Sequence, residues 1–383
     1  YLEVEALDEY TVQFRLNDVD ARFLSNLGYG ILPKHILGDV PATELEEHEF
    51  TRNPIGSGPF KFEEWVDGQH VQLVKNENYW EGEPHLDRIV LKILGDQNAM
   101  MAQLEAGDVD MITPPATETP TLERWEEEGL IKLSSVLGYQ YNYLGFNLRR
   151  PMFADKETRQ AITHAIDRET IVEEVGYGQG QVAHGPVSPL SWAYSDDMPR
   201  FEYDPDRARE LLAEAGWEEG PDGILVRDGE RFSFTIKTNS GNQIREDIAV
   251  IIQSYLKDVG IEVKTEFVEW GAFLDQINPP NWDFDAIILG WALGTDPDPR
   301  AIWHSDEIEQ GLNYTGFSRE DVDELIDQNV YFVDQDERAE ALQEIFKIIA
   351  EEQPYSFLYY PNDLWALPTN LEGFTHHPRI AYY

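Results

Sequence analysis

"FSFTIKTNSGNQIREDIAVIIQSYLKDVGIEVKTEFV", residues 232–268, alternates two hydrophobic patterns that predict different secondary structures. Its two ends are rich in β-branched and aromatic residues that alternate with polar ones, as in half-buried strands. Its middle part, 245–260, has apolar residues at helical spacing and ends at a glycine. A helix at 270–277 and a strand at 284–291 continue the series. This alternation of strands and helices predicts a parallel sheet covered by helices.

Segments on both sides of this region extend the prediction. Residues 10–16 alternate apolar and polar side chains, which predicts a half-buried strand. Residues 60–75 predict a hairpin that turns at Asp67-Gly68. The other predicted strands are 88–94, 109–112 and 139–147, and the other predicted helices are 98–107, 155–175, 204–217 and 336–354.

Negative charge dominates the composition, with 73 acidic residues against 29 basic ones and a formal net charge of -44. The acidic residues are spread along a chain that also has 10 Trp, 18 Tyr and 18 Phe, which indicates a folded protein with an acidic surface. Nucleic acid is not expected as a partner, because phosphate binding needs clustered Lys and Arg. The absence of cysteine excludes disulfides, thiol nucleophiles and thiolate metal sites.

A surface with many carboxylates and few lysines is what we expect of a protein that works in molar salt. Under such conditions the screening length falls to about 3 Å, so repulsion between carboxylates is tolerated. The alternative is an ordinary acidic secreted protein. The halophilic interpretation predicts that the stability of the fold rises with salt concentration.

Motifs of enzymatic and cofactor chemistry are missing from the sequence. The nine histidines are scattered, no H-E-x-x-H pair occurs, and neither "GSGPFK" (56–61) nor "GYGQG" (176–180) has the spacing of a phosphate-binding loop. Carboxylate pairs are so frequent in this chain that they do not indicate a glycosidase. We therefore expect no catalytic residue, no metal site and no cofactor.

The stretch "ILGWALGTDPDPRAIWHS" (288–305) places Trp291 where an apolar strand ends. That edge of an α/β sheet is where ligands bind, so Trp291 either lines a binding site or belongs to the core. Asp296 and Asp298 are each followed by proline, and either contact a ligand or stabilise a turn. Calcium at these acids is disfavoured, because the twelve-residue loop with its closing Glu is missing.

Several blocks form a series along the chain. They are "ILPKHIL" (31–37), "NPIGSGPFKFEEW" (53–65), "NENYWEGEPHLDRIVLKIL" (76–94), "AQLEAGDVDMI" (102–112), "YLGFN" (143–147), "RQAITHAIDRETIV" (159–172), "ARELLAEAGW" (208–217), "GIEVKTEFVEWGAFLDQI" (260–277) and "LYYPNDLWAL" (358–367). In number and order they resemble the family 5 extracellular solute-binding proteins, the peptide/nickel-type receptors of ABC importers. The resemblance covers essentially the whole chain.

The resemblance implies an α/β fold of the type II periplasmic-binding-protein kind, a two-lobe Venus flytrap with mixed sheets covered by helices. The first lobe is expected at residues 1–141 and 355–383, and the second at 142–354. Family members carry a further block before residues 10–16. We therefore expect the N-terminal portion of the first lobe to be missing from this chain, with apolar faces exposed and solute affinity reduced.

The resemblance also implies a binding site. In peptide-binding relatives an aspartate three residues after the tryptophan pairs with the amino terminus of the peptide, and some have an arginine before the tryptophan. Here these positions are Gly294 and Ile288, and the acids come later. The expected ligand-binding residues are Trp291, Gly294, Asp296, Asp298, Tyr143, Asn147, Asn239, Trp270, Trp192 and Tyr359.

The function that the resemblance implies is capture of a small solute and its delivery to an ABC permease. An oligopeptide is the expected solute, and an oligosaccharide or a nickel chelate is the alternative. We expect the protein to be extracellular or periplasmic, tethered to the outer face of the cell membrane, and monomeric when full length. Two other functions remain open: a glycoside hydrolase, which would turn its ligand over, and a sensory adaptor that presents solute to a signalling receptor.

Overall fold

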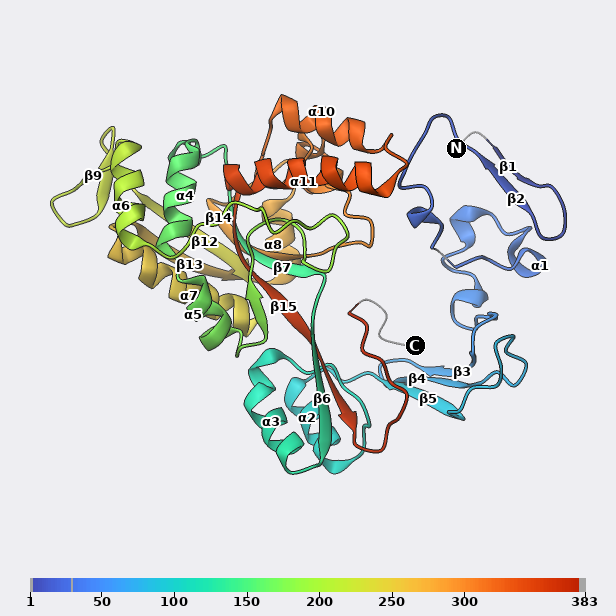
Figure 1. Ribbon diagram of the computed structural model, residues 1–383. Coiled ribbons are helices and arrows are strands. Elements are labelled where there is room, and N and C mark those ends of the chain that lie inside the picture. The colour runs from blue at the N-terminus through green and yellow to red at the C-terminus, as the bar shows by residue number, and fades with distance from the viewer. Residues whose placement is uncertain (1–2, 29, 379–383) are drawn as a thin grey trace. The chain divides into compact units, whose positions relative to one another are not determined.

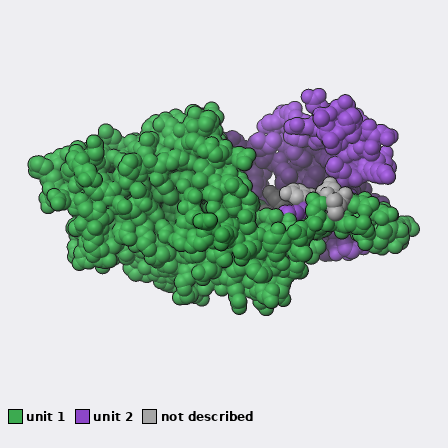
Figure 2. Space-filling view, turned by 90° about the horizontal axis from the view of Figure 1, so that it is seen from above, with its two compact units in different colours: residues 1–25, 115–383 green, residues 26–114 purple. Residues whose placement is uncertain are grey.

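The structure is a computed structural model that describes residues 3–28 and 30–378. The chain divides into two compact units, which Figure 2 shows in different colours. Unit 1 consists of residues 1–25 and 115–383, and unit 2 consists of residues 26–114. Figure 1 labels most of the helices and strands of both units.

A seven-stranded mixed sheet forms the centre of unit 1. β12 (Ser233–Asn239) pairs in parallel with β13 (Glu262–Val268) and with β14 (Ala286–Ala292), which confirms the parallel arrangement expected from the sequence. β7 (Gln140–Phe146) pairs antiparallel with β14, and β15 (Tyr355–Pro368) pairs antiparallel with β7. The sheet is therefore parallel on one side and antiparallel on the other.

β15 changes its neighbours along its length. It pairs with β7 as far as Tyr359, where the register shifts, and with β6 (Ile131–Leu137) from Asn362 onward. β8 (Gly180–Val182) pairs with β15 from Tyr359 to Pro361. Residues 141–146 and 355–361 thus lie in neighbouring strands of one sheet.

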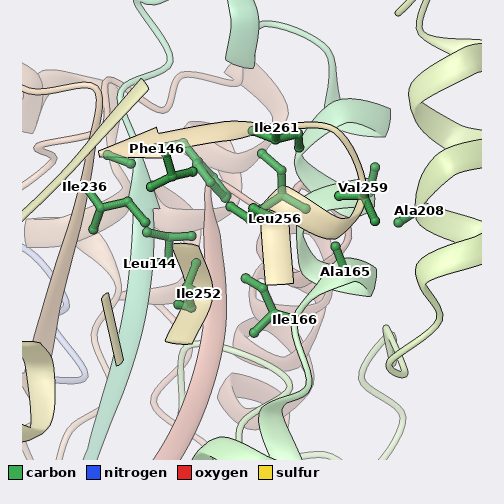
Figure 3. Close-up of a cluster of buried hydrophobic side chains, with 14 of the residues drawn as sticks. Leu144, Phe146, Ala165, Ile166, Ala208, Ile236, Ile252, Leu256, Val259 and Ile261 are labelled. Atoms are coloured by element: carbon green, nitrogen blue, oxygen red, sulfur yellow. The ribbon is translucent and has the colours of Figure 1, made fainter. Parts of the chain in front are cut away.

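Helices cover both faces of this sheet and bury two hydrophobic clusters. The helices on one face are α4 (Lys156–Ala165), α6 (Pro205–Glu214) and α7 (Gln243–Asp258), and Figure 3 shows part of the cluster that they bury. The helices on the other face are α8 (Trp270–Ile277), α10 (Glu320–Asn329) and α11 (Gln335–Glu352). The short elements of unit 1 are α3 (Thr119–Glu127), α5 (Arg168–Thr170), β9 (Glu218–Glu219), β10 (Leu225–Arg227), β11 (Glu230–Arg231) and α9 (Arg300–Trp303).

α7 illustrates how the hydrophobic pattern becomes packing. Asn242 caps its N-terminus, where the side-chain oxygen accepts a hydrogen bond from the backbone of Arg245. Ile248, Ile252 and Leu256 are spaced four residues apart and are fully buried against the sheet. Because α7 follows β12 directly, this packing fixes the first turn of α7 at the edge where β12 ends.

Two predicted elements differ in the structure. The helix predicted at 155–175 is interrupted at Ile166, whose backbone is extended, and Asp167 then caps α5 with a hydrogen bond from Thr170 N. An aspartate in mid-helix competes with the helix for backbone hydrogen bonds, which accounts for the break. The strand predicted at 109–112 is wrong, because only Ile112 makes a strand-like pairing.

Unit 2 contains the predicted hairpin. β3 (Phe60–Val66) and β4 (His70–Lys75) turn at Gly68, whose φ of 68° suits glycine, and β5 (Arg88–Lys92) completes a three-stranded antiparallel sheet. Among the described residues of unit 2, the α-helices are α1 (Lys34–Leu37) and α2 (Gln97–Ala106), and α2 ends at a glycine as predicted.

Most apolar side chains before residue 115 are exposed or only partly buried. β1 (Glu3–Ala6) and β2 (Val12–Arg15), which belong to unit 1, form a separate hairpin in which every residue is exposed. The predicted strand at 10–16 exists, but its predicted half-burial is wrong. Alternation of apolar and polar residues gives a strand one apolar face, but it does not determine whether another segment covers that face. In the part of the chain that the structure describes, no segment buries the apolar face of β2.

The spread of acidic side chains predicts a strong effect of salt on stability. Glu44, Glu46 and Glu47, for example, lie close together in the sequence and are exposed. Because salt screens repulsion between such carboxylates, we expect the melting temperature to rise from dilute buffer to molar KCl. Scanning calorimetry at a series of KCl concentrations measures this. A melting temperature that stays constant over the series would contradict the halophilic interpretation.

Candidate functional site

The candidate site lies at the edge of the main sheet where the parallel strands β12 and β14 end. Gly290 near the end of β14 stands opposite Asn142 in β7, and Asn142 stands opposite Tyr359 in β15. Asn239 is the last residue of β12, and the first turn of α7 follows it. Carboxyl ends of parallel strands are the usual position of ligand sites in α/β sheets, so this row of residues is a candidate binding edge.

Arg245 in the first turn of α7 lies over this row. Its Nη1 donates a hydrogen bond to Asn239 Oδ1 at 2.9 Å, whereas its buried Nε has no acceptor in the part of the chain that the structure describes. Its Nη2 lies only 3.3 Å from the point where a Cβ on Gly290 would stand, so glycine at that position makes room for the guanidinium. Arg245 therefore reaches across the end of β14.

The charge of Arg245 is not compensated by a carboxylate among the described residues. Burial lowers the pKa of Arg245, and the nearby phenol groups of Tyr143 and Tyr359 oppose that effect. Arginine stays protonated even so, and a cation in the first turn of a helix is disfavoured by the helix dipole. A desolvated cation with unused donors in such a place suits a carboxylate that arrives with a ligand.

Tyr359 contributes a neutral hydroxyl to the same edge. It is only 3% exposed, and burial raises the pKa of its phenol to about 12 although the cation of Arg245 favours ionisation. At physiological pH the phenol is therefore protonated, so it does not neutralise Arg245. The predicted site residues Asn239 and Tyr359 are thus brought together around an arginine that was not predicted.

Trp291 projects to the opposite face of the sheet. Its ring is half-buried and stacks against Tyr143, with 6.4 Å between centroids, and against Tyr314, with 5.7 Å. Its Nε1 donates a hydrogen bond to the hydroxyl of Tyr355 at 3.3 Å. Tyr143 is fully buried and stacks on Tyr355, so it belongs to the core. Trp291 is therefore both the outermost ring of a core cluster and partly accessible to a ligand.

The two acids after β14 already have partners within the chain. Both carboxylate oxygens of Asp296 accept hydrogen bonds from Arg338, at 2.6 and 2.7 Å. Asp298 accepts one from Arg22 at 2.8 Å and another from the backbone of Arg300 at 3.0 Å. A ligand contact for these carboxylates stays a prediction, and it would have to compete with the arginines.

The remaining predicted residues are distributed around the sheet. Gly294 is exposed in the loop after β14, and Trp192 donates a hydrogen bond from Nε1 to Thr295 O in that loop at 3.2 Å. Trp270, 47% exposed, begins α8 just after β13 ends. Asn147 lies at the opposite end of β14, where its amide donates to backbone oxygens that include Phe284 O. The role of Asn147 as a ligand contact remains a prediction.

Metal binding and membrane spanning receive no support from the residues that the structure describes. None of their His, Asp and Glu side chains gather into groups of three or more that suit a metal ion. Nor is any helix in those residues long and apolar enough for a membrane span.

Comparison with known proteins gives the family. A model of the bacterial extracellular solute-binding proteins, family 5 (Middle), matches residues 1–308. Oligopeptide-binding protein AppA of Bacillus subtilis is 48% identical over an alignment of 386 positions, which covers 99% of this chain and 70% of AppA. The alignment with AppA therefore spans both units.

Solved structures agree with this relationship. AppA of Bacillus subtilis in complex with a nonapeptide has a TM-score of 0.80 at 48% identity, covering 98% of this chain and 75% of that one. NikZ of Campylobacter jejuni in complex with Ni(L-His) has a TM-score of 0.82 at 27% identity, covering 97% and 74%. These neighbours confirm the expected fold class, that of the two-lobe periplasmic binding proteins with mixed sheets. The chain belongs to the bacterial extracellular solute-binding proteins of family 5.

Proposed function

We propose that this chain is the solute receptor of an ABC importer and that its solute is an oligopeptide. The proposal draws on the family, on the 48% identity to an oligopeptide-binding protein and on the likeness to peptide complexes of AppA and of DppA from Helicobacter pylori. In this function the protein captures a peptide outside the cell and passes it to a permease in the membrane.

The observation that carries the proposal is the uncompensated guanidinium of Arg245. A linear peptide brings a carboxylate at its C-terminus, and Arg245 has unused donors at a sheet edge that also offers the amides of Asn142 and Asn239. Arginine binds carboxylates through paired hydrogen bonds, and an amide can complete the set. Arg245 would thereby fix one end of the peptide.

The other predicted residues complete the proposed site. The accessible part of Trp291 and the exposed ring of Trp270 would contact apolar portions of the peptide, and the loop at Gly294 would lie beside its backbone. A nickel chelate stays the alternative solute because a relative binds Ni(L-His), and an oligosaccharide stays a prediction.

The family consists of receptors, and an enzymatic role has no support from it. We propose that the protein does not turn its solute over, that it acts as a monomer when full length, and that it is tethered to the outer face of the membrane. We also propose lobes at residues 1–141 with 355–383 and at 142–354. These lobe limits come from the resemblance, whereas the compact units follow contacts within the chain.

The proposed function is tested by calorimetric titration with a synthetic nonapeptide. We expect saturable binding of one peptide per chain and recovery of the intact peptide by mass spectrometry afterward. Cleavage of the peptide would identify an enzyme. Absence of binding, with binding of an oligosaccharide or of nickel-histidine in its place, would refute the oligopeptide as the solute.

A further inference from the structure

The loop Leu293–Pro299 joins β14 to α9 and carries the residues expected beside the solute. Trp291 precedes this loop, and Gly294 lies within it. The loop has no regular structure of its own. A backbone hydrogen bond from Leu293 N to Tyr139 O at 2.9 Å attaches its first residue, and side chains from elsewhere reach the residues that follow. Four such side chains come from segments distant in sequence: Arg338 on α11, Trp192, Arg22, and Ser25, whose Oγ lies 3.5 Å from Oδ2 of Asp296.

The attachment to Arg338 is the strongest of these. Its two terminal nitrogens bind the two oxygens of Asp296 at 2.6 and 2.7 Å, a bidentate pair. The side chain of Arg338 is 4% exposed and that of Asp296 is 14% exposed, so water screens the pair little. The Nε of Arg338 donates to Oδ1 of the fully buried Asn329 at 3.2 Å, which fixes the guanidinium on the side away from the loop.

Trp192 supports the same arrangement. Its ring centroid lies 5.6 Å from the guanidinium of Arg338, and its Nε1 donates to Thr295 O in the loop. Arg338 is thus held between an aromatic ring and Asn329, and it holds Asp296 in turn. Removing a single partner of such a buried pair leaves the other charge desolvated and unpaired.

We propose that Arg338 is a positioning residue for solute binding: it holds the loop Leu293–Pro299 through Asp296, and Asp296 does not itself contact the solute. The inference rests on the proposed function. A loop that is ordered before the peptide arrives loses less conformational entropy on binding than a mobile one. Arg338 already neutralises the charge of Asp296 and donates to both of its oxygens, so an amino group of a peptide would have to compete with Arg338 for this carboxylate.

The test compares Asp296→Asn, Arg338→Gln and the double variant with the unmodified chain. The probe is a nonapeptide with a free amino terminus, alongside its N-acetylated twin. We expect each single variant to bind both peptides about tenfold more weakly, to the same degree, and the double variant to be no worse than the weaker single variant. Arg338→Lys should fall in between, because lysine keeps the charge but not the paired hydrogen bonds.

Arg227→Gln is the matched control. Arg227 also pairs with an aspartate, Asp155, and lies over a tryptophan ring, that of Trp217, but it has no contact with the loop. The Arg227→Gln variant should reduce the melting temperature as Arg338→Gln does, and it should leave the peptide affinity unchanged. Equal loss of affinity in the control would show that Arg338 acts only through overall stability, and would overturn the inference.

Two further results would also overturn it. A loss confined to the peptide with the free amino group in Asp296→Asn would show that Asp296 contacts the solute. Unchanged affinity in Arg338→Gln while the unmodified chain binds would show that positioning is unnecessary. If the unmodified chain binds no peptide, the proposed function fails. Hydrogen exchange then still tests whether Arg338 holds the loop. The inference requires the backbone of the loop to exchange faster in Arg338→Gln than in the unmodified chain.

Discussion

Arg245→Gln is expected to weaken binding of a nonapeptide with a free C-terminal carboxylate by about 2–4 kcal/mol, or about 30- to 700-fold. The reason is that the guanidinium is desolvated and has no carboxylate partner among the described residues. Glutamine keeps a hydrogen-bonding amide near Asn239 but cannot neutralise a carboxylate. Calorimetric titration of both proteins with the same peptide measures the difference.

A C-terminally amidated nonapeptide is the matched ligand control. It lacks the negative charge, so the unmodified protein and Arg245→Gln should bind it with nearly equal affinity. The variant should keep or raise the melting temperature, because it removes an uncompensated cation from a partly buried place. An equal loss of affinity for both peptides, together with a lower melting temperature, would assign Arg245 to the support of the fold.

Trp291→Ala is expected to weaken peptide binding by about 1–3 kcal/mol. If Trp291 only lined a binding site, as the sequence suggests, the melting temperature of Trp291→Ala would be nearly unchanged. The structure alters that expectation, because the ring also stacks on Tyr143 and Tyr314 and donates a hydrogen bond to Tyr355. The alanine variant should therefore lose both affinity and stability.

Trp291→Phe separates the two effects. Phenylalanine keeps an aromatic ring for the stack and should recover most of the stability, whereas it has less surface for the peptide and lacks Nε1. We expect its affinity to remain below that of the unmodified protein in the same titration. Full affinity in both Trp291 variants, with stability lost only in the alanine variant, would place Trp291 in the core alone.

The sequence predicts best where a pattern is local. The strand and helix alternation at 232–291 is correct because each apolar period there corresponds to a face that is buried in the structure. At residues 10–16 the same type of pattern predicts the strand but not its exposure, because burial depends on what covers a face. The break at Ile166 depends on Asp167, whose capping competes with helix continuation.

The candidate site shows the same limit. Asn239 and Tyr359 were expected, but Arg245, which lies over them, was not, although a cation in the first turn of a helix after a strand is a detectable signal. The partner of Asp296 is Arg338, on a helix 42 residues farther along the chain. Nothing local in "GTDPDP" identifies that partner, so the sequence could not separate a ligand contact from an internal ion pair.

Hydrogen–deuterium exchange of the chain, with and without a saturating synthetic nonapeptide, tests the central claim most directly. The account predicts that the peptide slows exchange in two segments of unit 1, around residues 239–246 at the start of α7 and around 289–296 at the end of β14, while the peptide stays intact. Saturation with peptide that leaves both segments unchanged, or that protects only segments away from this sheet edge, would contradict it.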